Sequence, residues 1–192
     1  MSKIRTFVAV EISPKTRESA GRLIDRLQSC DSGIRWVDLK RLHLTLNFLG
    51  EVDERDLHKV CQAVGDASGS IPEFVLSCRG VGAFPDLKRP RTVWIGVDQG
   101  SQEISDLQRA TEDTLSELGF PKERRKYHPH LTIGRARRGT ANHKQLTELM
   151  TQLEDIELGT TSLSEVVVFS SELEPTGPVY QALSRCPLGV TL

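Results

Sequence analysis

An alternation of polar and apolar side chains marks residues 42–48 as a β-strand. Successive side chains in a strand point to opposite faces of the sheet. His43 and Thr45 therefore share one face. The residues on either side of them share the other face: Leu42, Leu44, Leu46 and Phe48. Such a strand would bury its apolar side and present an imidazole beside a hydroxyl on the opposite side.

The same His-x-Thr-x pattern occurs a second time along the chain. His130 and Thr132 share one expected face of this strand, and Leu131 and Ile133 share the other. The two histidines are separated by 130 − 43 = 87 residues. Two such strands facing each other would place two imidazoles and two hydroxyls around one pocket.

The surrounding hydrophobic pattern repeats with nearly the same spacing, which indicates an internal repeat. Arg5 and Thr6 precede one apolar run, and Arg91 and Thr92 precede another, 91 − 5 = 86 residues later. We therefore expect residues 1–192 to form a single two-lobed domain of two similar β-α-β-α-β halves, related by a rough two-fold axis. The predicted helices span residues 14–28, 53–67, 101–118 and 142–153. Besides the two motif strands, the predicted strands span residues 5–12, 34–37, 74–81, 91–98, 163–169 and 179–185.

Composition is that of an ordinary globular protein, with 38% hydrophobic and 27% charged residues and a formal net charge of −1. Nothing global requires a nucleic-acid or membrane partner. Charge is nevertheless unevenly distributed, because residues 121–138 contain seven basic residues and one acidic residue. This cluster brackets the second motif, so it is either a solvated face or part of a pocket for an anion.

The four cysteines show no C-x-x-C spacing, which is typical of reduced thiols in the cytoplasm. They are Cys30, Cys61, Cys78 and Cys186. No stretch approaches the roughly 18 apolar residues of a transmembrane helix, and the apolar run near the N-terminus is too short for a signal peptide. We expect a cytoplasmic protein that does not associate with membranes.

Four segments together resemble a known family. They are RWV at 35–37, LHLTLNFLGEV at 42–52, FPDLKRPRTVWIGV at 84–97 and HPHLTIGRARR at 128–138. The chain is similar here to the two-histidine phosphoesterases, and most similar to the bacterial RNA 2′,3′-cyclic phosphodiesterases, also called 2′-5′ RNA ligases. The resemblance spans nearly the whole chain. It implies a bilobal α+β fold, in which two pseudo-symmetric halves with antiparallel sheets surround a central cleft and the helices lie outside.

The resemblance also implies roles for individual residues. His43 would be the proton donor and His130 the proton acceptor, although the near-symmetry of the repeat leaves the reverse assignment open. Thr45 and Thr132 would complete the catalytic set, and Arg135 would bind phosphate. The implied substrate is an RNA or oligonucleotide with a 2′,3′-cyclic phosphate end, and the implied enzyme is a monomer without a metal cofactor.

The residue types suit this chemistry independently of the family. Opening a cyclic phosphate requires one group to deprotonate water and another to protonate the leaving oxygen, and histidine titrates near neutral pH. Threonine hydroxyls can donate to phosphate oxygens as charge builds up, and an arginine adds a charge-assisted hydrogen bond. Strict alternation places Arg135 on the apolar face with Leu131, so the chain must turn near Gly134 for this side chain to reach the pocket.

Several alternatives remain open at this point. A zinc ion could in principle be bound by His43, His128 and His130. A nucleobase could stack on an aromatic ring, although alternation places Phe48 in the core and Trp36 in packing, leaving Tyr127 as a candidate. The same four catalytic residues would also suit a 2′-5′ oligonucleotide or small cyclic-nucleotide phosphodiesterase. A protein from another class, an RNA-binding module that holds a phosphate end without catalysis, would show the same pattern.

Overall fold

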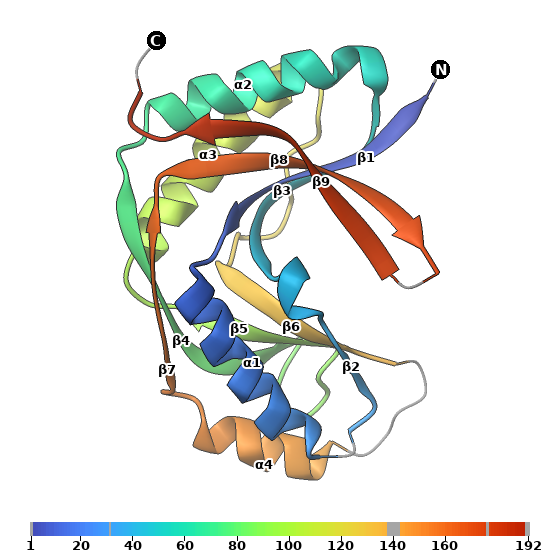
Figure 1. Cartoon of the computed structure of the whole chain (residues 1–192), viewed down its shortest axis with the longest axis vertical. Helices are drawn as coiled ribbons and strands as arrows, with labels where there is room; N and C mark the ends of the chain where they lie inside the picture. Colours follow the sequence, from blue (N-terminus) through green and yellow to red (C-terminus); the bar gives the residue numbers. More distant parts are fainter. Residues whose placement is uncertain (1, 31, 138–142, 176, 191–192) are drawn as a thin grey trace.

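The computed structural model describes residues 2–30, 32–137, 143–175 and 177–190. In this part of the chain nine strands form one continuous sheet and four α-helices lie outside it (Figure 1). The strands are β1 (Lys3–Glu11), β2 (Ile34–Trp36), β3 (His43–Asp53), β4 (Phe74–Phe84), β5 (Thr92–Val97), β6 (His130–Ala136), β7 (Glu157–Leu163), β8 (Glu165–Glu174) and β9 (Gly177–Pro187). The helices are α1 (Pro14–Gln28), α2 (Leu57–Gly69), α3 (Ser101–Glu117) and α4 (Lys144–Gln152).

The sheet is organised symmetrically about the two motif strands. Its order is β7-β4-β5-β6-β3-β1-β8-β9, with β2 paired to β6, and β3 meets β6 through the antiparallel pair Leu44–Leu131. Read outward from this pair, β3-β1-β8-β9 corresponds to β6-β5-β4-β7. The α+β fold with two pseudo-symmetric antiparallel halves is therefore confirmed. The motif strands do not face each other across a gap, as the sequence suggested, but are neighbours in one curled sheet.

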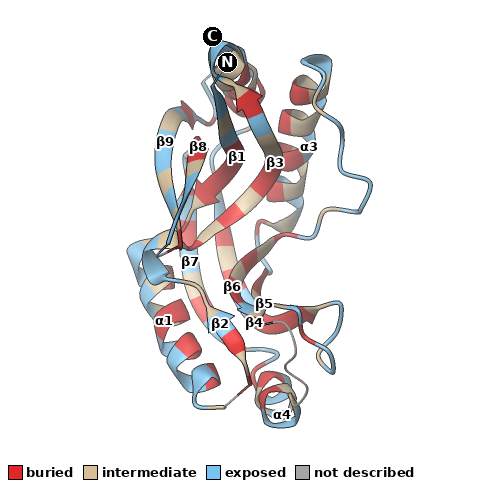
Figure 2. Cartoon of the chain, turned by 90° about the vertical axis from the view of Figure 1, so that its right-hand side faces the viewer, coloured by how far each residue is buried: buried red, intermediate tan, exposed pale blue. Residues whose placement is uncertain are grey.

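Each lobe contains strands from both halves of the sequence. β4, from the first half, pairs with β5, and β8, from the second half, pairs with β1. The helices follow the same division. α2 and α3 pack against each other and against the β3-β1-β8-β9 lobe, whereas α1 and α4 cover the other lobe (Figures 1 and 2). This exchange couples the two lobes on either side of the β3–β6 junction.

The start of α1 shows how local sequence sets an element. Ser13 is the N-cap, its hydroxyl accepts a hydrogen bond from the backbone N–H of Thr16 at 3.1 Å, and Pro14 occupies the first helical position. The apolar side chains of this helix are spaced by three or four residues and are buried: Ala20, Leu23, Ile24 and Leu27. Burial of these side chains packs α1 against its lobe.

A β-bulge in β3 reverses the alternation of side chains after the first motif. Leu46 has no partner in β1 between the pairs formed by Thr45 and Asn47. Leu46 and Asn47 are consequently both buried, and Asn47 accepts a 2.6 Å hydrogen bond from the hydroxyl of Thr111 in α3. Phe48 then turns to the face of Thr45. The prediction that Phe48 lies in the core is wrong, because its side chain is 59% exposed.

β6 has a bulge at the equivalent position. Ile133 has no partner in β5 between the pairs formed by Thr132 and Gly134. Arg135 follows the two residues of this bulge, Ile133 and Gly134. Its side chain is therefore turned from the apolar face to the face of His130. This bulge supplies the turn that the sequence required for Arg135 to reach the pocket.

Other predicted elements differ from the structure mainly at their ends. The predicted strand 163–169 corresponds to the end of β7 and the start of β8, which are separated at Ser164. β7 was not predicted, because its sequence ELGTTSL is largely polar and contains Gly159 at a φ of 107°. The predicted second helix begins as a 3-10 turn (Glu54–Asp56) before α2. The first residue of the predicted helix 142–153, Asn142, lies outside the described residues.

Candidate active site

The polar sides of β3 and β6 line one pocket of about 390 Å3. A volume of this order is typical of a small-ligand site, for which roughly 300–1,000 Å3 is usual. The pocket walls include both imidazoles, both threonines and the arginine predicted from the sequence: His43, Thr45, His130, Thr132 and Arg135. The structure thus brings all five residues together.

The pairing that joins the lobes determines how the two motifs face each other. Continued by one residue, the antiparallel register of this single pair would place His43 opposite Thr132 and His130 opposite Thr45. In that register each imidazole would neighbour the other motif's threonine across the strands, and His43 also contacts its own threonine, Thr45, along the strand. The two histidines are diagonal neighbours, a relationship that spans about 7–8 Å in a regular ladder. A phosphate group fits between side chains at that separation.

Backbone carbonyls fix the tautomer of both imidazoles. The Nδ1 atom of His43 lies 2.8 Å from the carbonyl oxygen of Arg41, and Nδ1 of His130 lies 2.7 Å from that of His128. A carbonyl can only accept, so each Nδ1 carries the proton and each neutral ring has its lone pair on Nε2. Nε2 of His43 lies 3.1 Å from the Thr45 hydroxyl, which donates to it. Nε2 is therefore the atom available for proton transfer.

Aromatic rings surround both imidazoles. The ring centroid of His43 lies 4.9 Å from that of Phe7 and 5.3 Å from that of Tyr180. The ring of His130 lies edge-on to Phe84 at 5.1 Å. Burial lowers the pKa of both histidines from the ordinary value of 6.5, and the backbone hydrogen bonds at Nδ1 only partly oppose this effect. In the resting protein both rings are consequently poised to be neutral at pH 7.

Three arginines converge on this pocket. Arg5, Arg41 and Arg135 all line it together with Tyr180. Burial raises the pKa of the Tyr180 hydroxyl, and the charges of the three nearby arginines oppose that increase. Sequence reasoning identified only Arg135. Arg5 lies two residues before Phe7 in β1, and Arg41 lies two residues before His43, and these positions alone gave no signal for function.

Tyr127 and Trp36, two of the aromatic residues considered for base stacking, make contacts within the protein instead. The Tyr127 hydroxyl donates a 3.0 Å hydrogen bond to the backbone carbonyl of Thr45, and burial raises the pKa of Tyr127. Trp36 is half-buried and packs over Gly134, in agreement with the prediction that it packs within the protein. Phe48 is the exposed ring at this pocket, and the guanidinium carbon of Arg5 lies 5.0 Å from its ring centroid.

Neither a metal-binding cluster nor a membrane-spanning helix occurs among the residues that the structure describes. Within the described ranges, no group of three or more His, Cys, Asp or Glu side chains is arranged to hold a metal ion, so His43, His128 and His130 do not form a zinc site there. None of the described helices is long and apolar enough to cross a membrane. Arg138, part of the predicted basic cluster, lies outside the described residues.

A pocket lined by two imidazoles, two threonine hydroxyls and three arginines has the groups that suit binding of a phosphate ester, and comparison with known proteins points to the same class of protein. A family model described as the 2′-5′ RNA ligase superfamily matches residues 16–172. An RNA 2′,3′-cyclic phosphodiesterase of Methanothermobacter thermautotrophicus is 39% identical over 178 residues, covering 93% of this chain and 95% of the relative. A protein of the same name from Thermotoga maritima is 31% identical over 185 residues, covering 95% of each chain. The chain belongs to the 2′-5′ RNA ligase superfamily.

Solved structures support the fold assignment. The crystal structure of TT0787 of Thermus thermophilus matches with a TM-score of 0.80 at 24% identity, covering 97% of this chain and 98% of that one. The structure of Escherichia coli LigT complexed with 3′-AMP matches with a TM-score of 0.78 at 23% identity, covering 97% and 99%. At this identity the likeness concerns the fold alone.

Proposed function

We propose that the chain is an RNA 2′,3′-cyclic phosphodiesterase, which hydrolyses 2′,3′-cyclic phosphate ends to 2′-phosphomonoesters. The observation that carries this proposal is that His43 and His130, from adjacent strands, line one pocket together with two threonine hydroxyls. The names of the relatives, with identities of 31–39% over most of the chain, support the same activity.

Substrate binding would use the cations and hydroxyls of the pocket. Arg135 would donate charge-assisted hydrogen bonds to the non-bridging phosphate oxygens. Thr45 and Thr132, which lie on the same face as the histidines, would donate to the same oxygens as negative charge builds up in the transition state. Arg41 lies on the wall beside His43 and adds a further positive charge. This arrangement stabilises a pentacoordinate phosphorus between the two imidazoles.

Each of the two Nε2 atoms would then carry out one proton transfer. Nε2 of neutral His130 takes a proton from water as the water oxygen bonds to phosphorus, and the P–O3′ bond breaks. Protonated His43 gives its Nε2 proton to the departing O3′, leaving a 3′-hydroxyl and a 2′-phosphate. The bound phosphate anion favours the protonated state of His43, which burial disfavours in the free protein.

Turnover of a 2′,3′-cyclic mononucleotide in the presence of EDTA tests the proposed function and its independence from metals. We expect undiminished hydrolysis with EDTA. Turnover that disappears with EDTA and returns with a divalent cation would overturn the metal-free mechanism. Binding without turnover would identify a non-catalytic RNA-end module, and hydrolysis of 2′-5′ linkages in preference to cyclic ends would favour the oligonucleotide phosphodiesterase.

A sulfur-substituted substrate tests which histidine is the acid. A cyclic substrate with sulfur in place of O3′ has a leaving group that needs little protonation. His43→Ala should therefore lose much less activity on this substrate than on the oxygen substrate, whereas His130→Ala should lose the same on both. The opposite result would assign the acid to His130.

The reverse reaction, the oligomeric state and the cellular compartment of the enzyme are part of the same proposal. Run backwards, the site would join a cyclic phosphate to a 5′-hydroxyl and form a 2′-5′ linkage, with hydrolysis favoured in water. One chain supplies both halves of the pocket, which supports a monomer as the active unit. All four cysteines are free thiols, which supports the expectation of a cytoplasmic enzyme.

A further inference from the structure

The active-site pocket opens into a longer groove. A second hollow of about 670 Å3 shares Thr45, Phe48 and His130 with it. A third hollow of about 620 Å3 shares Gln108 and Tyr127 with the second and continues along α3. The three hollows thus adjoin one another through shared lining residues, so a polymer whose end lies at the histidines could extend along the surface past the second and third hollows.

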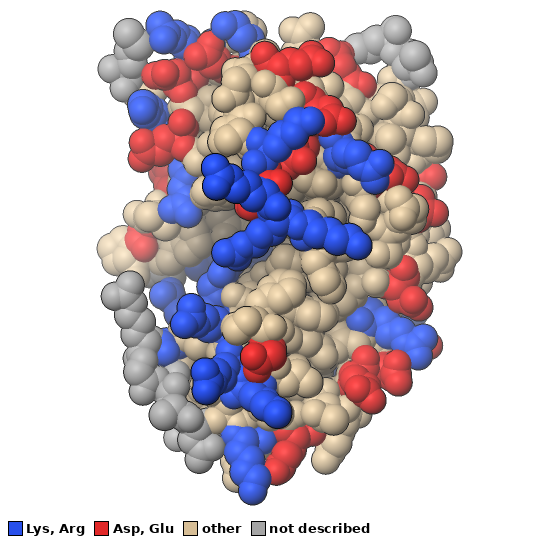
Figure 3. Space-filling model, turned by 180° about the vertical axis from the view of Figure 1, so that it is seen from behind, with Lys and Arg blue, Asp and Glu red and all other residues tan. Residues whose placement is uncertain are grey.

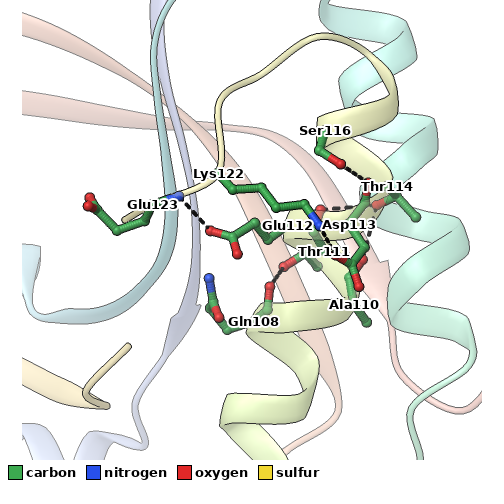
Figure 4. Close-up of polar contacts among 9 residues, drawn as sticks. All are labelled: Gln108, Ala110, Thr111, Glu112, Asp113, Thr114, Ser116, Lys122 and Glu123. Carbon is green, nitrogen blue, oxygen red and sulfur yellow. Dashed lines mark hydrogen bonds and ion pairs between the residues drawn. The ribbon is translucent and has the colours of Figure 1, made fainter. Parts of the chain in front are cut away.

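One side of this groove is formed by residues 121–126, which we call the basic strap. The strap follows α3, and α3 holds it by two contacts (Figure 4). The Lys122 ammonium pairs with the carboxylate of Asp113, and the backbone N–H of Glu123 donates to Glu112 at 3.0 Å. The tyrosine that follows the strap is fixed in turn by its hydrogen bond to β3. The strap is thus pinned at both ends along the groove.

The remaining cations of the strap are not neutralised by the protein. Arg124, Arg125 and Lys126 are exposed, and none of the salt bridges among the described residues involves them. The neighbouring acid, Glu123, uses its carboxylate to accept the backbone N–H groups of Arg124 at 2.9 Å and Arg125 at 3.3 Å. Seen from behind, lysine and arginine side chains gather across the middle of the molecule (Figure 3).

An exposed aromatic side chain, Phe48, lies where the first two hollows adjoin. Phe48 lines both of them, and its ring is 59% exposed. Arg5 lies over one face of the ring. Unpaired cations along a groove together with an exposed ring are the two features that bind single-stranded nucleic acid, through phosphate neutralisation and base stacking respectively.

We propose that this groove binds the single-stranded body of the RNA upstream of its cyclic end. A base near that end stacks on Phe48, and the following phosphates bind Arg124, Arg125 and Lys126. The substrate class is therefore a single-stranded RNA several nucleotides long, in contrast to a mononucleotide. This inference rests on the proposed function and names the form of its substrate.

The test compares a 2′,3′-cyclic mononucleotide with an oligoribonucleotide of about six nucleotides bearing the same end, a length within the roughly 4–16 nucleotides of single-strand sites. The wild type should have a higher kcat/KM on the oligonucleotide. The triple variant Arg124→Ala, Arg125→Ala, Lys126→Ala should reduce the ratio of the two kcat/KM values at least tenfold, mainly through KM. Each lost phosphate contact should flatten the slope of log(kcat/KM) for the oligonucleotide against log[salt] by about 0.7.

A matched control removes three exposed cations from α1, on the opposite side of the molecule: Lys15→Ala, Arg22→Ala and Arg26→Ala. The control should keep the wild-type ratio and salt slope, which separates a local site from the effect of net charge. Equal losses in both triple variants, or no length preference in the wild type, would overturn the proposal. An equal loss on mononucleotide and oligonucleotide in the strap variant would also overturn it. Absence of turnover on either substrate would instead contradict the proposed function.

Discussion

Phe48 and Arg135 occupy equivalent positions in the two halves, 135 − 48 = 87 residues apart and three residues after the threonine of each motif. Both side chains line the active-site pocket because a bulge precedes each of them, at Leu46 in β3 and at Ile133 in β6. The repeat therefore extends beyond the histidines and threonines to the bulges themselves. It places an aromatic ring at one position and a guanidinium at the other, which breaks the symmetry of the pocket.

Because of this asymmetry, substitutions of Arg135 and of Phe48 should have different effects on the kinetics. Arg135→Ala should raise KM for every cyclic substrate, because in the proposed function the lost guanidinium binds the phosphate that all of them share. A charge-assisted hydrogen bond contributes about 1.5–3 kcal/mol, so kcat/KM should fall roughly tenfold to hundredfold. Arg135→Lys should restore only part of the loss, since an ammonium cannot form the bidentate contact. Steady-state kinetics on a cyclic mononucleotide measure both variants, and an unchanged KM in Arg135→Ala would contradict the assignment.

Phe48→Leu keeps an apolar side chain and removes the ring. Stacking on a base contributes about 1–3 kcal/mol, so we expect a roughly tenfold or larger loss in kcat/KM with kcat little changed. Phe48→Tyr keeps the ring and should retain activity. The contrast between the two variants separates stacking from simple packing, and equal activity in both would show that no base stacks there.

How much of this could be read from the sequence depends on the register of the strands. The histidines and threonines lie before the bulges, so simple alternation placed them correctly, and the matched repeat brought them to one pocket. Phe48 lies after a bulge, and the same rule placed it in the core. Nothing in a single sequence marks Leu46 as the residue that leaves the ladder. The position of the bulge can be inferred only when the two halves are aligned, because Arg135, which is equivalent to Phe48, needs the same change of face to reach the pocket.

The exchange of β4 and β8 between the lobes was also beyond the sequence. The repeat predicts that each half has similar strands, but the hydrophobic pattern does not say which edge each strand joins. The pairing of β4 with β5 and of β8 with β1 is visible only in the assembled sheet. Similarly, Arg5 and Arg41 reach the pocket through this assembly, so their positions in the chain gave no indication of a role.

Hydrolysis should show a bell-shaped dependence of kcat/KM on pH, with its maximum on the acid side of 6.5. Burial lowers the pKa of both histidines from that value in the free protein. The acid must be protonated, so activity falls as pH rises through its lowered pKa, and the base must be neutral, so activity falls again at lower pH. The bound phosphate anion raises the pKa of the acid, so the profile of kcat should lie at higher pH. A single-limbed curve would contradict paired histidines.

The two threonines should differ in their effect on this profile. Thr45 donates to Nε2 of His43, and no corresponding bond joins Thr132 to His130 among the residues described by the structure. Loss of a neutral donor costs about 0.5–1.5 kcal/mol, so Thr45→Val and Thr132→Val should each reduce kcat by roughly threefold or more. Only Thr45→Val should also raise the pKa of the neighbouring imidazole, because the hydroxyl donates to its neutral form. Thr45→Ser keeps the hydroxyl and should show the wild-type pH profile. If Thr45→Val, Thr132→Val and Thr45→Ser all have the same pH profile, Thr45 does not influence the pKa of His43.

Gly134, beside the second bulge, should not tolerate a side chain. A Cβ atom there would lie 2.6 Å from Cγ2 of Ile34 and 2.9 Å from Cε3 of Trp36. Gly134→Ala should therefore lower the free energy of unfolding by about 1–3 kcal/mol, the usual cost of overpacking. Gly65→Ala is the matched control, since a Cβ at this position in α2 meets nothing within 4 Å. It should raise stability by roughly 0.5–1 kcal/mol because alanine favours a helix over glycine. Urea denaturation monitors both variants, and equal stability of Gly134→Ala and the wild type would show that the packing of β2 on β6 is looser than these distances indicate.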